Sequence, residues 1–122
     1  MKHNSLSKLK PIIKPDYSKK ILFNPVDFVQ PGYLLQVVTI PPKTKQRIHF
    51  HHKQTEVFYV LFGTAQLTIN DAEYQTKPGD AFICSPGDKH NLWNQSDENY
   101  EILVFKINFQ SNDEDTKWES KL

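Results

Sequence analysis

The chain has 122 residues and a formal net charge of +1, which predicts one domain and gives no overall reason to expect nucleic-acid binding. It contains one cysteine, so an intrachain disulfide is excluded and a reducing compartment is favoured. The longest apolar run, Val57 to Phe62, is too short to cross a bilayer, and residues 1–20 lack the apolar region of a signal peptide. We therefore expect a cytoplasmic protein without a membrane partner.

Residues 1–32 are predicted to form an N-terminal arm that packs on the main domain or on a partner subunit. Pro11 and Pro15 interrupt any helix in this arm. Two short apolar patches, residues 12–13 and 21–23, can pair as edge strands or lie along a partner. The lysines of residues 1–20 and the acids of residues 111–122 give the two ends opposite charge, and we expect both ends to be solvated.

Residues 33–109 are predicted to form the main domain, because short segments rich in strand-forming residues alternate there with turn signals. Asn70-Asp71 is typical of a tight hairpin. This pattern predicts an all-β sandwich or barrel without a long helix. The expected strands are 33–40, 46–51, 56–62, 65–69, 73–76, 81–84, 90–94 and 100–109. Strand 56–62 is apolar on both sides and should be covered on both faces. Residues 110–122 are predicted to be a charged tail, either frayed or forming a short helix that ends near Trp118.

Four residues have side chains that can bind a metal ion. His49 and His51 are two apart, so on a strand they point to the same side. Glu56 opens the following strand, and His90 can join them from a distant one. Neutral imidazoles with one carboxylate suit Mn, Fe, Co, Ni or Zn. We therefore predict that one divalent transition metal ion per chain is bound by His49, His51, Glu56 and His90.

The same residues carry a family resemblance that covers roughly residues 33–109. The first stretch, His49-x-His51-x4-Glu56-x6-Gly63, resembles the first motif of the cupin superfamily. The second stretch, Gly79-x6-Pro86-Gly87-x2-His90-x3-Asn94, resembles its second motif. The resemblance is to small, single-domain, metal-binding cupins of the conserved-barrel type. It implies a double-stranded β-helix, also called a jelly-roll barrel, with the ion inside, and it implies that chains commonly pair as homodimers.

Two positions depart from the family pattern. Lys43 stands where the family often places a glycine, and the usual Pro-x-Gly is contracted to Pro86-Gly87. Neither change touches a metal ligand, so both bear on loop shape.

Three residues are candidates for binding a small-molecule ligand. Arg47 lies on the side of the strand that carries His49 and His51, where a guanidinium can clamp a carboxylate or phosphate. A salt bridge from Arg47 to Asp80, Asp88 or another acid at the rim is an equally good interpretation. Phe58 and Leu92 are each two residues from a metal ligand on their own strand, so we expect them in the cavity. No residue is assigned a catalytic role.

Three functions fit these observations. The first is a metal-dependent enzyme that performs isomerase- or lyase-type chemistry on a sugar, a sugar acid or a keto acid. The second is an Fe-dependent dioxygenase, and the third is a cupin that binds a small molecule without turnover. In each case we expect a homodimer, formed through the apolar residues of strand 57–61 and of the N-terminal arm.

Overall fold

The computed structural model describes residues 1–111 and 113–119, and its regular structure is almost entirely β. The strands are β1 (Ile12–Ile13), β2 (Ser18–Phe23), β3 (Tyr33–Ile40), β4 (Thr44–Lys45), β5 (His49–His51), β6 (Thr55–Phe62), β7 (Ala65–Ile69), β8 (Ala72–Thr76), β9 (Ala81–Cys84), β10 (His90–Asn94), β11 (Tyr100–Ile107) and β12 (Thr116–Trp118). Within the described residues the helical segments are short 3-10 turns, Leu6–Lys8, Pro25–Asp27 and Asp113–Asp115, all outside the predicted main domain. The described part of the chain holds no helix long and apolar enough to cross a membrane.

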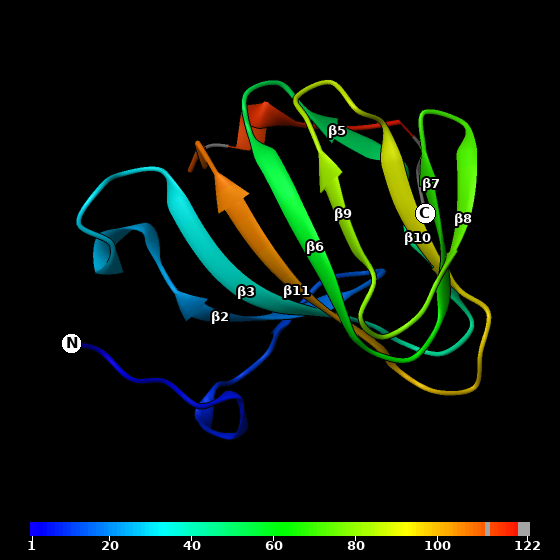
Figure 1. Cartoon of the computed structure of the whole chain (residues 1–122), viewed down its shortest axis with the longest axis horizontal. Helices are drawn as coiled ribbons and strands as arrows, with labels where there is room; N and C mark the ends of the chain where they lie inside the picture. Colours follow the sequence, from blue (N-terminus) through cyan, green and yellow to red (C-terminus); the bar gives the residue numbers. More distant parts are fainter. Residues whose placement is uncertain (112, 120–122) are drawn as a thin grey trace.

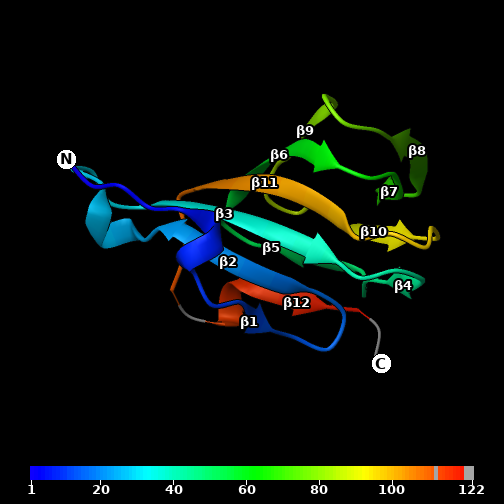
Figure 2. The same cartoon turned by 90° about the horizontal axis from the view of Figure 1, so that it is seen from below.

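The strands form two antiparallel sheets, as expected for a jelly-roll barrel. Sheet A has the strand order β1-β2-β3-β11-β6-β9, and sheet B has the order β12-β5-β10-β7-β8, with β4 also paired to β10. In Figure 1, β3, β11, β6 and β9 run side by side, while β10, β7 and β8 lie to their right. Figure 2 shows β1, β2 and β12 on the side of the molecule opposite β8 and β9.

The hydrophobic core lies between the two sheets, because alternate side chains of the central strands point inward. Ile102 and Val104 of β11 are almost fully buried, as are Val60 of β6 and Leu67 of β7. The Tyr100 hydroxyl is also inside, 2.7 Å from the Thr76 hydroxyl, and burial raises the pKa of this tyrosine to about 12. Several residues of this core, among them Ile102 and Val104, also line the cavity described below.

Three predicted elements differ from the structure. The expected strand 46–51 is interrupted, because the Gln46 N–H bonds to the Leu92 carbonyl oxygen and the Arg47 N–H bonds to a carboxylate of Asp16. Only β5 (His49–His51) remains of it, and a short strand, β4, lies just before it at Thr44–Lys45. The tail is neither frayed nor helical at residues 116–118, where β12 pairs with β5; residues 112 and 120–122 of that tail lie outside the described residues.

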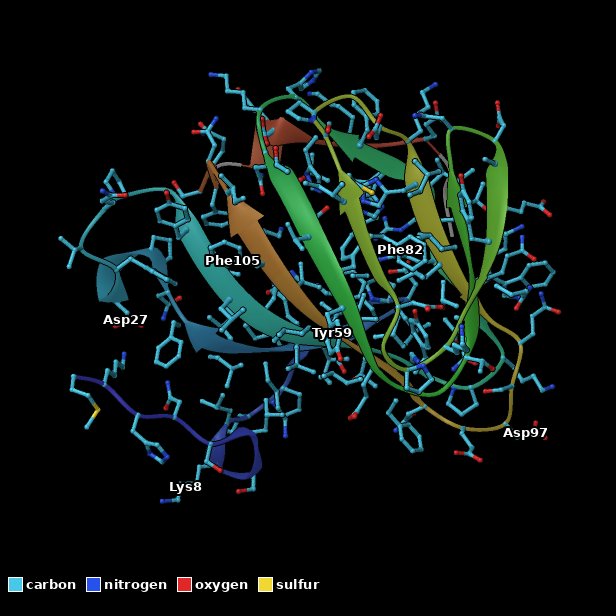
Figure 3. All side chains as sticks on the ribbon, viewed as in Figure 1. Lys8, Asp27, Tyr59, Phe82, Asp97 and Phe105 are labelled. Carbon is cyan, nitrogen blue, oxygen red and sulfur yellow. The ribbon has the colours of Figure 1, made fainter. Side chains whose placement is uncertain are left out.

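The third difference concerns β6, which was expected to be covered on both faces. Its outer side is open, with Tyr59 45% exposed and Leu61 41% exposed. Figure 3 labels Tyr59 on this strand. Only the inner side of β6, which carries Glu56, Phe58 and Val60, is buried.

Two turns explain residues singled out in the sequence. Gly63 has φ +81°, and a Cβ there would lie 2.6 Å from the Asn99 carbonyl oxygen, so only glycine fits. Lys43 has φ +54°, the left-handed conformation that glycine adopts easily. Its ammonium group donates to the Gln95 carbonyl oxygen at 2.7 Å, which helps to hold this turn. Lys43 therefore adopts the kind of backbone conformation for which glycine is the usual residue.

Candidate metal centre and its cavity

The predicted ligand residues converge in the interior between the sheets. His49, His51, Glu56 and His90 are all buried, and one potential ligand atom from each lies within 4.8 Å of the others. The strand register explains this convergence, because His90 of β10 pairs directly with His49 of β5. The His51 Nε2 lies 2.6 Å from the Glu56 Oε1, and the His90 Nε2 lies 3.2 Å from the same oxygen. These four side chains form a cluster that can bind one metal ion.

The hydrogen bonds around the cluster orient the imidazoles for metal binding. The His49 Nδ1 lies 3.2 Å from the Arg47 carbonyl oxygen, and the His90 Nδ1 lies 2.8 Å from the Asp88 carbonyl oxygen. A carbonyl oxygen can only accept, so each Nδ1 carries the proton and donates it. The Nε2 atoms of these two histidines are therefore the nitrogens left for a metal ion, which is the arrangement that metal-binding histidines use, once any proton on Nε2 is released. The donor set fits a borderline divalent metal with ligand distances of about 2.0–2.2 Å.

Burial, hydrogen bonds and nearby charges shift the pKa values of the cluster in opposite directions. Burial, with help from the charge of His90, lowers the pKa of His49 to about 3, so His49 is neutral near pH 7. Burial opposes the charge on Glu56, but the Lys106 ammonium and hydrogen bonds from two imidazoles outweigh it and hold the carboxyl pKa well below its usual range. Burial likewise opposes the charge on His90, but hydrogen bonds with Cys84 and Glu56 raise its pKa to about 10. A metal ion competes with that proton, because a ligating imidazole must be neutral.

A cavity of about 580 Å³ opens onto the cluster. All four cluster residues line it, and so do Phe58 and Leu92, as the alternation along their strands predicted. The Phe58 ring centroid lies 5.8 Å from that of His90. The volume falls in the range of about 300–1,000 Å³ typical of small-molecule sites.

Arg47 also lines the cavity, and its ion-pair partner is Asp16 rather than Asp80 or Asp88. The Asp16 Oδ2 accepts from the Arg47 backbone N–H at 2.8 Å and from its Nε at 3.3 Å. On its other side the guanidinium lies 4.0 Å from the centre of the Trp118 ring. Arg47 therefore forms an ion pair, as one interpretation of the sequence expected, and it also lines the cavity, as its predicted role in ligand binding requires.

Several polar residues on the cavity wall were missed in the sequence, among them Lys106 and Gln36. Lys106 of β11 pairs with Glu56 of β6, and Gln36 of β3 is 3% exposed. A signal for both was present, because each interrupts an apolar face at period two. Lys106 follows Ile102 and Val104, and Gln36 lies between Leu34 and Val38.

The two ends of the chain also reach the site, so the expectation that both are solvated is wrong for the buried Asp16 and incomplete for the others. Lys14 and Lys19 line the cavity, and Asp16 is 2% exposed. At the other end, the Thr116 hydroxyl lies 2.9 Å from the His51 Nδ1. The Trp118 ring centroid lies 4.5 Å from that of His49. Nothing in the local sequence pattern indicated these long-range contacts.

Comparison with known proteins agrees with this fold and cluster. The family profile described as the cupin domain matches residues 36–106, which is more than half of the chain. An oxidoreductase of Arthrobotrys oligospora is 36% identical over 73 residues, 59% of this chain, but the chain spans only 27% of that protein. An oxalate-binding protein of Thermotoga maritima is 27% identical over 68 residues, 56% of each chain.

Among solved structures, a polyketide cyclase of Streptomyces resistomycificus superposes with a TM-score of 0.80 at 20% identity, covering 92% of this chain and 82% of the cyclase. At that identity the likeness concerns the fold alone. The profile match, the two facing sheets and the His-His-Glu-His cluster lead to the same conclusion: the chain belongs to the cupin family.

Proposed function

We propose that the protein binds one divalent transition metal ion through His49, His51, Glu56 and His90 and uses it to act on a small oxygenated metabolite. The observation that carries this proposal is the position of the cluster on the wall of a cavity large enough for such a molecule. Four protein ligands leave coordination positions open on a six-coordinate ion, as a catalytic site requires. Isomerase- or lyase-type chemistry on a sugar, sugar acid or keto acid is the function we favour.

The bound ion would supply Lewis-acid polarisation of a carbonyl or hydroxyl oxygen. The protein residues would position the substrate. In this proposal Phe58 and Leu92 contact its carbon skeleton, and Arg47 binds an oxygen-rich group. Burial of the cluster supports the idea, because electrostatic stabilisation is stronger where water is excluded. The similarity to an oxalate-binding protein is consistent with an oxygen-rich ligand.

The test is elemental analysis of protein purified without a metal-affinity column, alongside His49→Ala and His90→Ala. We expect about one ion per wild-type chain and loss of that ion from both variants, because each substitution removes a ligand. His52→Ala is the matched control, since His52 is exposed and outside the cluster.

Wild-type protein that stays metal-free after incubation with Mn, Fe, Co, Ni and Zn salts would contradict the proposed function. If metal is bound, oxygen consumption with candidate substrates separates an Fe-dependent dioxygenase from an isomerase or lyase. Binding without turnover would leave a small-molecule-binding cupin.

We also propose that the chain forms a homodimer through the outer side of β6 and β9. Tyr59 and Leu61 of β6 and Ile83 of β9 are exposed there, and β9 is an edge strand of sheet A. Exposed apolar side chains beside an edge strand favour association with a second copy. Sedimentation velocity should show a dimer that dissociates on Ile83→Lys but not on Val26→Lys, an exposed position on the arm. A dimer that survives Ile83→Lys would place the interface elsewhere.

A point substitution tests this dimer more cleanly than removal of the N-terminal arm, such as deletion of residues 1–24. β2 pairs with β3 over much of its length, so the deletion would remove a strand from sheet A and expose the β3 edge.

A further inference from the structure

The charge of the cavity wall is strongly asymmetric. Four cationic side chains line it, from Lys14, Lys19, Arg47 and Lys106, whereas Glu56 is the only acidic residue among the described lining residues. Asp16 lies behind Arg47 and balances that charge in part. A divalent ion on the cluster would add further positive charge. Such a cavity attracts anions and disfavours cations.

Lys106 is the cation whose position is best defined by the fold. Strand pairing sets it directly beside Glu56, at the end of an inward-facing row with Ile102 and Val104. Its ammonium lies 5.4 Å from the ring centroid of Phe109, another cavity-lining residue. A lysine in this row is therefore directed along the cavity wall next to the candidate metal ion.

Two buried amide groups in the same cavity have spare acceptor capacity. Gln36 and Gln54 both line the cavity. Their Oε1 atoms are buried and have no hydrogen-bond partner among the described residues. The orientation of Gln54 is fixed, because its Nε2 donates to Asp115 Oδ2 at 2.8 Å and a carboxylate oxygen can only accept. Buried acceptors without a partner are unfavourable, so a ligand that brings hydroxyl donors would satisfy them.

From these observations we propose that the ligand is a small hydroxylated metabolite with an oxyanion group. Lys106, supported by Arg47, holds the oxyanion, while Gln36 and Gln54 accept hydrogen bonds from its hydroxyls. A sugar acid and a sugar phosphate share this chemistry, and a neutral sugar lacks it. The inference deepens the proposed function and depends on the same metal-loaded cavity.

A simpler role for Lys106 is to balance the charge of Glu56. The two roles differ in what they affect. A balancing lysine acts on the metal cluster alone, whereas an anion-binding lysine determines whether the metal-loaded protein prefers a charged ligand over a neutral one. Measurements of metal content and of ligand affinity on the same samples therefore separate them.

The experiment is calorimetric titration of the metal-loaded protein with gluconate, glucose 6-phosphate and glucose, with metal content measured before and after each titration. We expect at least one of the two anions to bind and glucose to bind at least tenfold more weakly. Lys106→Met should weaken anion binding by about tenfold or more, because it removes a charge-assisted hydrogen bond. Lys106→Arg should retain most of the affinity, and Lys8→Met, at an exposed position on the arm, should leave it unchanged.

Gln36→Leu should reduce the affinity for the hydroxylated anion but not for acetate or inorganic phosphate, which carry no sugar hydroxyls. The anion that binds, gluconate or glucose 6-phosphate, identifies the source of the oxyanion. Three results would overturn the inference: glucose binding as tightly as the anions, no anion binding by metal-loaded protein, or unchanged anion affinity in metal-loaded Lys106→Met. Failure to load metal would instead overturn the proposed function, so the two failures are distinguishable.

Discussion

The cluster and the mouth of the cavity are built in different ways. The four cluster residues come from β5, β6 and β10, all within residues 36–106, the part matched by the cupin domain profile. The name mouth is used for Arg47 with its two partners, Asp16 near the N-terminus and Trp118 near the C-terminus, and both partners lie outside the matched part. Thr116, also outside the matched part, contacts His51 of the cluster. The family portion of the chain thus supplies the candidate ligands, and the two ends shape what surrounds them.

The physical constraints on the two regions also differ. Strand register fixes the cluster, since the His49–His90 pair follows from backbone hydrogen bonding between β5 and β10. Individual side-chain contacts fix the mouth, with Arg47 held between a carboxylate and an indole ring. Substitutions of Asp16 or of the Arg47 side chain should therefore change stability and ligand binding while leaving metal content largely intact.

The largest effect is expected for Asp16→Ala. This change removes a buried acceptor that holds both the backbone N–H and the side chain of Arg47. Hydrogen bonds to a buried charged group contribute about 1.5–3 kcal/mol, so we expect the free energy of unfolding to fall by about 2 kcal/mol. Urea denaturation monitored by circular dichroism would measure the change.

Asp97→Ala is the matched control for that substitution. Asp97 forms an ion pair with Lys43, but its side chain is 90% exposed, so the free energy of unfolding should change by less than about 0.5 kcal/mol. An Asp16→Ala variant as stable as the control would mean that the mouth contributes little to folding. Loss of metal from Asp16→Ala would mean that metal binding by the cluster depends on the contacts of the mouth.

A smaller effect is expected for Thr116→Val, which links the two regions. The change keeps the shape of the side chain but removes the hydroxyl that contacts the His51 Nδ1. Loss of such an orienting partner typically weakens metal binding about 10–100-fold. We expect the lower end of this range, because His51 itself is kept and the other three ligands are unchanged. Competition with a chromophoric chelator would measure the metal Kd.

Thr116→Ser retains the hydroxyl and should keep the affinity of the wild type. Thr64→Val, at an exposed turn position, controls for removal of a threonine hydroxyl elsewhere. Equal metal affinity in Thr116→Val and wild type would show that β12 does not orient His51.

The contrast also explains which features the sequence predicted. Three cluster residues follow from local alternation: His49 and His51 point the same way on β5, and Glu56 begins the next inward-facing row. His90 lies 34 positions beyond Glu56, and the resemblance to the second cupin motif linked it to the others. The succession of short strands and turns predicted an all-β sandwich or barrel, and the resemblance to cupins implied the jelly-roll barrel. Phe58 and Leu92 in the cavity were predicted by the same alternation.

The features that were missed depend on contacts between segments distant in the sequence. Asp16 meets Arg47 across 31 positions, and Thr116 meets His51 across 65. No periodicity encodes such a meeting. The charge of the N-terminal arm was misleading for the same reason. A lysine-rich arm is normally solvated, so the sequence predicted solvated lysines. In the structure β2 pairs with β3, and Lys19 of β2 lies on the cavity wall.

The smallest effect is expected for the contact between Arg47 and Trp118. A guanidinium stacked over an indole at a partly exposed site contributes about 0.5–1 kcal/mol. A double-mutant cycle with Arg47→Met and Trp118→Ala should therefore give a coupling energy in that range from urea denaturation. The matched cycle uses Lys45 and Trp93, whose ammonium-to-ring distance is 4.7 Å against 4.0 Å for Arg47 and Trp118.

We expect a weaker coupling in the Lys45–Trp93 pair, because an ammonium is more strongly hydrated than a guanidinium and does not stack. Coupling of the Arg47–Trp118 pair at or below that of the control would mean that the indole does not hold the guanidinium in place. Asp16 alone would then position Arg47, and the C-terminal strand would act on the site only through Thr116 and the Trp118 contact with His49.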